Sequence, residues 1–346
     1  IVYSIRQKPN VNYSKCFLYT FLSITLLLAG GLGFLYIIQP KVAFNHGKSG
    51  AYHHPTTEFK DYWMPDELGM TYKNLTIESR ITSSSSKFNK LYGWFVYHEE
   101  ISTQIPTIVY FHENDYFPPA RLYMIQKLFE NPQKYNVIMV DYRGYGYSEG
   151  TSSEDGLYQD SHAIMDYVLQ MDQIDTDQVF IFGASLGGAF ATYSALHYQD
   201  RVKGLILQNT LVNLERLVEL HAPIMKPILP YILTIKLPTD ERIPKIKLPM
   251  MFVIALEDEA TFPTEMFELY DLAEDSAIFR EVLEIPGCEH YLPWYYGGEE
   301  YDQKLTNFID MSLQHSGKKS STSFSLTKSI SNAKGSIQEW FGSYYS

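Results

Sequence analysis

The chain has 346 residues, enough for one large domain or two small ones, and 45% of them are hydrophobic, including 48 Phe and Tyr. The formal net charge is −12, and because residues 1–15 and the tail from Met311 each carry a net +3, the body between them holds about −18. A body this acidic argues against nucleic acid as a partner, since such binding depends on Lys and Arg that neutralise phosphates.

An uncharged run of 23 residues begins at Cys16 and ends at Ile38. A helix of this length spans roughly 34 Å, which is enough to cross the hydrocarbon core of a bilayer. A cleaved signal peptide is the competing interpretation, but its apolar region would be shorter and would precede small residues rather than QPKVAF. We therefore expect a transmembrane helix over 16–38, with the lipid bilayer as a partner. The basic segment 1–15 favours a body on the non-cytoplasmic side.

Three local features bear on processing and modification. The first residue is Ile rather than Met, so we expect either a processed N-terminus or a start within a longer product. Cys16 is either a plain apolar residue or an acceptor for a palmitoyl group. It lies far from the second cysteine, Cys288, so no disulfide framework is expected. Asn74-Leu75-Thr76 is a glycosylation sequon, which fits a non-cytoplasmic body.

An irregular connection over 39–73 precedes a domain over 74–310, in which short β-branched or aromatic runs alternate with helical patterns. Apolar spacings of three and four predict helices over 155–170 and 186–198. Strands that alternate with helices predict an α/β fold with a mostly parallel sheet, and two successive strands at the start predict an antiparallel hairpin. The predicted strands are Asn74–Ile81, Leu91–His98, Thr107–His112, Asn136–Asp141, Gln178–Gly183, Lys203–Gln208, Met250–Leu256 and Ile278–Ile285.

Two segments interrupt or follow the alternation. Residues 211–247 hold five prolines and no clear strand, which suggests a cap over an active site. Residues 311–346 are rich in Ser and Lys, a composition typical of a disordered tail.

Gly183-Ala184-Ser185-Leu186-Gly187 fits the pattern G-x-S-x-G, in which glycines permit a tight turn from a strand to a helix. QVFIFG before it is typical of a buried strand, and GGAFATYSALHY after it is typical of a helix. This context favours Ser185 as a nucleophile with the N–H of Leu186 as one oxyanion donor. An idle serine at an ordinary strand–helix turn is the alternative.

A serine nucleophile in this architecture is followed in the chain by an acid and then by a histidine. MFVIALEDEATFP places Asp258 just beyond a predicted strand, and we prefer it over its neighbours Glu257 and Glu259. FREVLEIPGCEHYLPW places His290 in a loop after the last predicted strand. The acid would hold the imidazole in one tautomer, and the imidazole would take the serine proton.

Together with these residues, five stretches carry a resemblance that runs from the N-terminal anchor to about Asp310. The sequence resembles the membrane-anchored alpha/beta-hydrolase-domain proteins of the Bem type, including the alpha/beta-hydrolase domain-containing protein thirteen group. The resemblance implies an eight-stranded alpha/beta-hydrolase fold, the triad Ser185, Asp258 and His290, and hydrolysis of acyl esters or thioesters on lipids or lipidated proteins. The stretches are PTIVYFH (106–112), DYRGYGYSEGTSSEDGLYQD (141–160), VFIFGASLGGA (179–189), ALEDEATFP (255–263) and PGCEHYLPW (286–294).

One loop departs from the family pattern. Where the family has His-Gly-Asn-Ala-Gly, this chain has His112-Glu113-Asn114-Asp115-Tyr116. The loop supplies the second oxyanion donor, which we assign to the N–H of Asn114. Glu113 removes the backbone freedom of glycine, and loss of one donor costs on the order of 10²–10³ in rate. Either the carboxylates of Glu113 and Asp115 lie near the developing oxyanion and destabilise it, or they point to solvent and the loop keeps its shape.

No other motif suggests a cofactor or a metal. The glycines of 141–150 do not match a phosphate-binding loop, and the remaining histidines lack metal-ligand spacing. The prediction is therefore a membrane-anchored serine hydrolase without a cofactor, acting on acyl-chain substrates. The alternative is a hydrolase-like membrane scaffold or complex subunit with little activity because of the altered loop.

Overall fold

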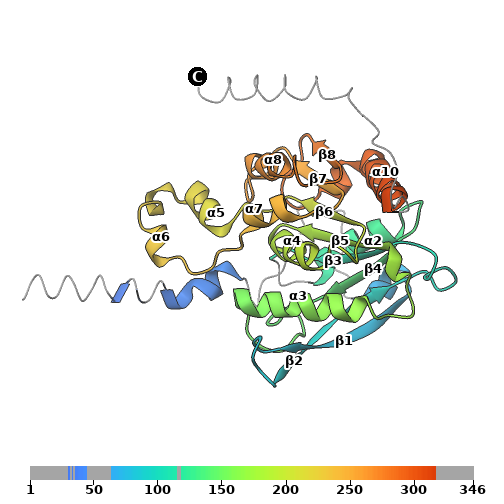
Figure 1. The fold of residues 1–346 in the computed structure, drawn as a ribbon, viewed down its shortest axis with the longest axis horizontal. Helices are drawn as coiled ribbons and strands as arrows, with labels where there is room; N and C mark the ends of the chain where they lie inside the picture. The colour runs from blue at the N-terminus through green and yellow to red at the C-terminus, as the bar shows by residue number, and fades with distance from the viewer. Residues whose placement is uncertain (1–29, 32, 34–35, 45–63, 115–117, 317–346) are drawn as a thin grey trace, which may run out of the picture.

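The computed structural model describes residues 30–31, 33, 36–44, 64–114 and 118–316 (Figure 1). An eight-stranded sheet runs in the order β1-β2-β4-β3-β5-β6-β7-β8. β2 is antiparallel to both of its neighbours, and the other neighbouring pairs are parallel. The strands are β1 (Tyr72–Arg80), β2 (Phe88–Val96), β3 (Thr107–Phe111), β4 (Asn136–Val140), β5 (Val179–Ala184), β6 (Gly204–Gln208), β7 (Met250–Ala255) and β8 (Arg280–Ile285).

This topology confirms the predicted hairpin and the mostly parallel sheet. Each predicted strand has its counterpart, with ends that agree within three residues. The largest difference is at β2, which begins at Phe88 rather than Leu91 because Phe88 pairs with Arg80 in the hairpin. Hydrophobic periodicity does not detect these first residues, since β2 is largely exposed there.

Helices cover both faces of the sheet (Figure 1). One face packs against α3 (Glu154–Val168), α4 (Leu186–Tyr198) and α8 (Pro263–Leu272), and the other packs against α2 (Pro118–Phe129) and α10 (Gly298–Ser316). Because successive strand residues point to opposite faces, β5 is buried on both sides: Val179 and Ile181 enter the first core and Phe180 and Phe182 the second. The sheet therefore holds the carboxyl end of β5 rigidly.

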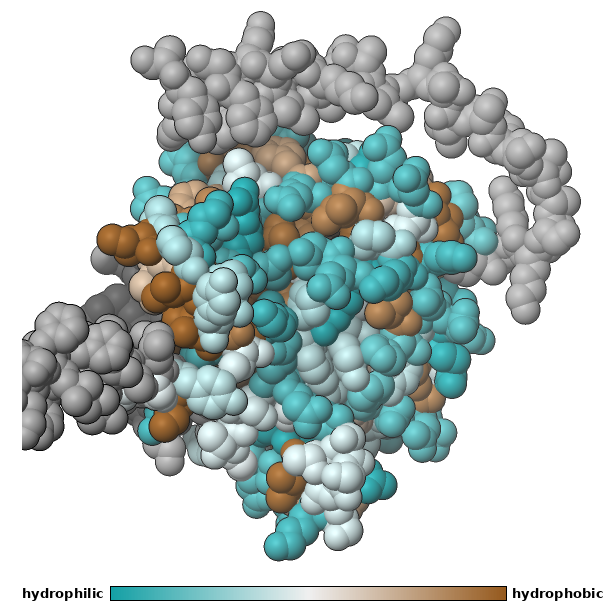
Figure 2. Space-filling model, turned by 60° about the vertical axis from the view of Figure 1, so that its left-hand side comes forward, coloured by the Kyte–Doolittle hydropathy of each residue, from teal (hydrophilic) through white to brown (hydrophobic). Residues whose placement is uncertain are grey.

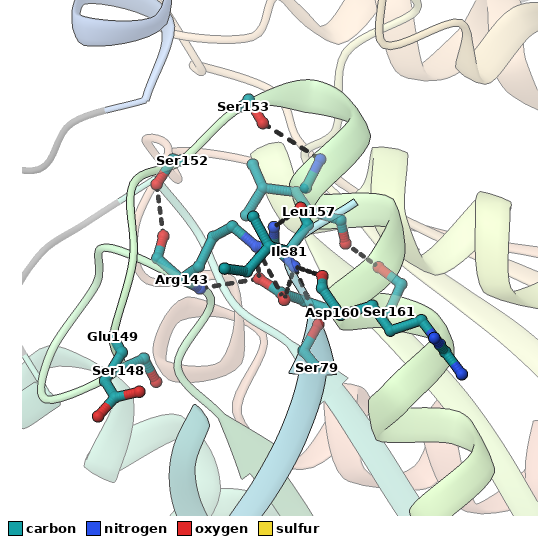
Figure 3. A network of polar contacts seen from close by, with 12 residues as sticks. Ser79, Ile81, Arg143, Ser148, Glu149, Ser152, Ser153, Leu157, Asp160 and Ser161 are labelled. Carbon is teal, nitrogen blue, oxygen red and sulfur yellow. Dashed lines mark hydrogen bonds and ion pairs between the residues drawn. The ribbon is translucent and has the colours of Figure 1, made fainter. Parts of the chain in front are cut away.

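A buried ion pair ties the loop after β4 to the hairpin (Figure 3). The Arg143 guanidinium contacts the Asp160 carboxylate of α3 at 2.7–3.1 Å and donates to Ser79 Oγ and to the carbonyl groups of Arg80 and Ile81. The Asp160 carboxylate also accepts the N–H of Arg143, at 2.8 Å. These contacts fix residues 141–160 beside the hairpin, and we refer to this stretch as the clamp.

A set of short helices lies between β6 and β7, over the segment expected to form a cap. Residues 211–247 contain no strand, as predicted, and α5 and α6 project from the body on one side (Figure 1). We refer to this segment as the cap. Its elements are α5 (Leu214–His221), η3 (Pro223–Met225), α6 (Leu229–Ile232), α7 (Thr239–Arg242) and η4 (Ile243–Lys245).

The N-terminal part that is described is a helix over residues 36–43, which lies against the cap. Gln39 donates to the carbonyl of Ile232 at 2.5 Å and accepts from the N–H and hydroxyl of Thr234 at 2.8 and 3.0 Å. Across the described ranges, no helix combines the length and apolar character that a bilayer crossing requires. Most of the predicted transmembrane segment 16–38 lies outside the described residues.

The boundaries of the two flanking segments differ from those expected. The connection 39–73 includes the end of this helix, a 3-10 turn η1 (Pro65–Leu68) and the first two residues of β1. α10 continues to Ser316, so residues 311–316 are helical rather than part of a disordered tail. Ser312 is buried in this last part of the helix, and a Ser-rich composition does not reveal such burial. Residues 317–346 lie outside the described residues.

Candidate active site

Ser185 occupies the turn between β5 and α4 in a strained backbone conformation. Its φ is 50° and its ψ is −123°, a region that side chains other than glycine rarely adopt. Two hydrogen bonds from the end of β6 hold it there. The Ser185 N–H donates to the Gln208 carbonyl at 2.9 Å, and the Thr210 hydroxyl donates to the Ser185 carbonyl at 2.6 Å. The turn therefore has the geometry of a nucleophile elbow, not of a relaxed strand–helix junction.

Two glycines of the motif are required by close backbone approach. A Cβ at Gly187 would lie 2.0 Å from the Phe111 carbonyl oxygen, and one at Gly183 would lie 2.4 Å from the Ala191 Cβ. The first contact lets α4 begin directly against the end of β3, where the oxyanion loop starts. The N–H of Leu186, in the first turn of α4, lacks an intrahelical acceptor by its position. A first-turn N–H of this kind is suited to bind a developing negative charge.

Ser185, His290 and Asp258 are joined by a continuous chain of hydrogen bonds. His290 Nε2 lies 3.0 Å from Ser185 Oγ, and His290 Nδ1 lies 2.6 Å from Asp258 Oδ2. These residues follow the ends of β5, β8 and β7, and Ser185 and His290 are 105 positions apart in the chain. Nδ1 is placed to donate to the carboxylate, which leaves Nε2 as the acceptor for the serine proton.

The carboxylate of Asp258 is buried and held by the turn that contains it. Oδ1 accepts the N–H groups of Ala260 and Thr261 at 2.8 and 2.9 Å, and Oδ2 accepts the Thr261 hydroxyl at 3.0 Å. The neighbouring Glu257 and Glu259 are exposed, and the carboxylate that contacts His290 is that of Asp258. Three donors of this turn hold the carboxylate so that Oδ2 faces the imidazole.

Polar residues at the end of β6 support the site, and the sequence interpretation did not identify them. Asn209, at φ 45°, donates from its amide to the His290 carbonyl at 2.9 Å and accepts the Ala255 N–H at 2.9 Å. The Thr261 hydroxyl lies 2.7 Å from the Asn209 carbonyl oxygen, so its single proton is shared between this carbonyl and Asp258 Oδ2. The polar run Gln208-Asn209-Thr210 after a buried strand was the signal available, because such residues need partners where a sheet ends.

The loop after β3 lies next to Ser185, and its fold answers one question left by the sequence. The Glu113 carboxylate accepts a hydrogen bond from the hydroxyl of Tyr110 at 2.6 Å, so it neither points freely into solvent nor lacks a partner. Burial, followed by the charge of Glu113, raises the pKa of Tyr110 well above its usual value, and Tyr110 remains a donor. Asp115 and Tyr116 of this loop lie outside the described residues.

Two tyrosines of the clamped stretch 141–160 hold the same loop. The Tyr142 hydroxyl donates to the His112 carbonyl at 3.1 Å, and the Tyr145 hydroxyl donates to Asn114 Oδ1 at 2.6 Å. His112 is buried, and its Nδ1 lies 2.7 Å from the Glu113 carbonyl, to which it donates. Burial and the nearby Arg121 lower the pKa of His112 well below its usual value, which keeps the imidazole neutral.

A cavity of about 220 Å³ opens at Ser185. Its polar side includes Ser185, His290, Glu113 and Asn114, and the helix of residues 36–43 contributes Ala43. Asn114 donates from its side-chain amide to the Ala43 carbonyl at 2.9 Å, so the N-terminal helix is a wall of the site. Where the chain is described, no group of three His, Cys, Asp or Glu side chains is arranged to hold a metal ion. The apolar side of the cavity is lined by Leu186, Leu211, Leu214, Leu217 and Leu237.

Comparison with known proteins places this site in a family. Residues 114–224 match the family model described as alpha/beta hydrolase fold. The alpha/beta hydrolase domain-containing protein WAV2 of Arabidopsis thaliana is 30% identical over 257 residues, which cover 71% of this chain and 81% of WAV2. The chain belongs to this alpha/beta hydrolase family. Protein bem46 of Schizosaccharomyces pombe, 28% identical over 83% of this chain and 90% of its own length, confirms the resemblance to the Bem type.

Two further matches add detail. A Saccharomyces cerevisiae relative, 27% identical over 80% of this chain and 90% of its own length, is named an uncharacterized membrane protein. Among solved structures, the Pyrococcus furiosus esterase Pf2001 superimposes with a TM-score of 0.58 and 16% identity, covering 76% of this chain and 99% of that one. At this identity the likeness concerns the alpha/beta hydrolase fold alone.

Proposed function

We propose that this chain is a membrane-anchored serine hydrolase that cleaves acyl ester or thioester bonds through an acyl-enzyme. The observation that carries the proposal is the hydrogen-bond chain from Ser185 Oγ through His290 to Asp258, at 3.0 and 2.6 Å. The strained turn at Ser185 and the leucine-lined cavity beside it support it further. Membership of an alpha/beta hydrolase family agrees with hydrolysis as the reaction class.

The reaction follows from these positions. His290 Nε2 takes the proton of Ser185 Oγ as the oxygen attacks the acyl carbon, and the carbonyl oxygen becomes an oxyanion. The N–H groups of Leu186 and Asn114 bind that oxyanion. The imidazolium, stabilised by Asp258, gives its proton to the departing alcohol or thiol. A water activated by the same imidazole then attacks the acyl-enzyme, and the second collapse releases a carboxylic acid and restores Ser185.

The membrane-anchored part of the proposal rests on the uncharged run Cys16–Ile38 and on the yeast relative that is named a membrane protein. A non-cytoplasmic body agrees with the exposed position of Asn74 on the edge strand β1, where a glycan would have room. Resistance to alkaline carbonate extraction tests the anchor, and a mobility shift on glycosidase treatment that is lost in Asn74→Gln tests the side. Extraction of the full chain by carbonate contradicts the anchor.

Labelling of the full chain with a fluorophosphonate probe tests the catalytic part. We expect label on the wild type, no label on Ser185→Ala, and label retained on Ser194→Ala, a control in the helix α4 that follows Ser185. Absence of label from folded wild type refutes the hydrolase.

The altered loop supports a second candidate, a hydrolase-like membrane scaffold with little activity. Glu113 lines the same cavity as Ser185, so its charge is close to the place where an oxyanion would form. The variant Glu113→Gly separates the two candidates. Label that appears only in Glu113→Gly favours the scaffold, whereas comparable label in wild type and variant favours the active hydrolase.

A further inference from the structure

Apolar side chains are exposed together on one side of the molecule. Five large apolar side chains in the described part of the chain are more than 70% exposed: Ile37 (73%), Val42 (72%), Tyr147 (78%), Ile224 (89%) and Tyr231 (87%). Four of these belong to the helix of residues 36–43 or to the cap. Figure 2 shows hydrophobic surface gathered on the side that carries the cap. Their concentration on two neighbouring elements distinguishes them from scattered exposed residues, which need no explanation.

The two elements form one surface because they are hydrogen-bonded to each other. Gln39 joins the helix of residues 36–43 to Ile232 and Thr234, at the end of α6. The same elements turn their inner sides toward the active-site cavity, through Ala43 from the helix and Leu214, Leu217 and Leu237 from the cap. The exposed apolar surface is therefore the outer side of the cavity wall.

The charges of this surface contrast with those of the body. Residues 222–238 carry two lysines, Lys226 and Lys236, and no acidic residue, whereas the body as a whole holds about −18. Lys226 is exposed and pairs with Glu219 of α5. Apolar and aromatic side chains interspersed with lysine are typical of segments that lie in the interfacial layer of a bilayer, where the ammonium groups reach the headgroups.

The helix of residues 36–43 also continues directly from the uncharged run Cys16–Ile38. If that run spans the bilayer, its C-terminal end reaches the interfacial layer close to Ile38, because the first charge after it is Lys41. The cap, fixed to this helix through Gln39, then lies at the same depth. This continuity selects a lipid surface, rather than a second protein, as the partner of the exposed residues.

We propose that residues 222–238 of the cap and the helix of residues 36–43 together lie in the interfacial layer of a lipid bilayer, so that acyl-chain substrates enter the Ser185 cavity from the membrane. The route of entry rests on the proposed hydrolase, whereas the contact with lipid does not. Leu214, Leu217 and Leu237 would receive the acyl chain as it leaves the bilayer. The substrate class is thereby narrowed to membrane-resident esters or thioesters.

A fluorescent reporter tests the contact independently of activity. The environment-sensitive dye NBD is attached to Cys at position 224 or 231 (Ile224→Cys, Tyr231→Cys), or at 147 as the control (Tyr147→Cys), in the full chain carrying Cys16→Ser. Cys288 is retained, because burial raises the pKa of its thiol to about 12 and so suppresses its reaction. Each labelled protein is reconstituted in phosphatidylcholine vesicles with and without doxyl-labelled lipid.

We expect blue-shifted emission that the doxyl lipid quenches for the dye at 224 and at 231, and water-like, unquenched emission at 147. Water-like emission at all three positions overturns the proposal. Blue-shifted emission that doxyl lipid does not quench, and that depends on protein concentration, also overturns it, because it identifies a second copy of the chain as the partner.

A kinetic experiment tests the route of entry. The double variant Ile224→Ser/Tyr231→Ser should lower kcat/KM on a long-chain ester dissolved in the vesicles by about tenfold or more, while leaving a short-chain, water-soluble ester within about twofold of wild type. Tyr147→Ser is the matched control and should affect neither. An equal loss on both esters overturns the proposed route. If wild type hydrolyses neither ester, the hydrolase fails, and the quenching result still decides the lipid contact.

Discussion

Glu265 is a buried carboxyl in the first turn of α8, close to the proposed triad. Its side chain is 1% exposed, and neither carboxylate oxygen has a hydrogen-bond partner within the described residues. Burial, and then the charges of Glu268 and Asp258, raise the pKa of Glu265 to about 8, although Arg216 of the cap opposes the shift. The carboxyl is therefore protonated in the folded protein at neutral pH.

The consequence for stability has a definite sign. In the unfolded chain the pKa of Glu265 returns to about 4.5, so between pH 4.5 and 8 the folded state binds a proton that the unfolded state has released. The free energy of unfolding then falls by about 1.4 kcal/mol per pH unit as pH rises through this window. Above pH 8 the free energy of unfolding is therefore roughly 5 kcal/mol lower than below pH 4.5, where Glu265 is protonated in both the folded and the unfolded state.

Glu265→Gln removes this dependence, because the amide has the shape of the protonated acid and does not ionise. Equilibrium urea unfolding of the full chain in a nonionic detergent, followed by tryptophan fluorescence, gives the free energy of unfolding at pH 5 and at pH 9. Between pH 5 and pH 9 we expect the free energy of unfolding of the variant to rise, relative to that of wild type, by up to roughly 4 kcal/mol. A relative change below about 1 kcal/mol refutes the protonated, buried carboxyl. Asp271→Asn, at an exposed position of the same helix, should stay within about 0.5 kcal/mol of wild type at both pH values.

Three further predictions concern the clamp, the elbow and the oxyanion loop. Arg143→Met leaves the Asp160 carboxylate buried without its cation and should lower the free energy of unfolding by about 3–5 kcal/mol in the same urea titration. Lys127→Met, the control, breaks the more exposed pair with Asp302 and should lower the free energy of unfolding by about 1 kcal/mol or less. Gly187→Ala places a Cβ against the Phe111 carbonyl, and the rate of fluorophosphonate labelling should fall by about 10²-fold or more with circular dichroism unchanged; a wild-type rate contradicts the close approach. Tyr110→Phe removes the donor that holds the Glu113 carboxylate and should slow fluorophosphonate labelling. The double variant Tyr110→Phe/Glu113→Gln should recover most of the labelling rate. If the double variant instead shows the sum of the losses of Tyr110→Phe and Glu113→Gln, the two side chains do not act as a unit.

The central strands β3 to β7 were predictable because they are buried on both faces. A run such as VFIFGA must supply both cores at once, so every residue is apolar or small and the pattern is visible without any tertiary information. The proposed triad was predictable for a different reason. Ser185, Asp258 and His290 follow β5, β7 and β8 in chain order, and a parallel sheet brings the carboxyl ends of these strands to the same edge.

The supporting contacts were not predictable, since they join residues whose proximity depends on the finished fold. Tyr142 and Tyr145 lie about thirty positions after His112 and Asn114, and nothing in their spacing indicates that their hydroxyl groups reach the oxyanion loop. The same holds for Glu113. Substitution of the family glycine indicated a disturbed loop, but the partner that binds the carboxylate, Tyr110, is an ordinary aromatic residue in a strand pattern.

The N-terminal helix of residues 36–43 is hydrogen-bonded to the loop after β3, next to the proposed nucleophile. Asn114, whose N–H is the proposed second oxyanion donor, uses its side-chain amide to bind the Ala43 carbonyl, and its Oδ1 accepts from Tyr145. A body from which residues 1–44 are removed would lose the first of these contacts and one wall of the cavity. The oxyanion loop would then be held from one side only, by Tyr142 and Tyr145. The helix of residues 36–43 is thus part of the cavity wall, and we expect the proposed activity to depend on the position of this helix against the cap.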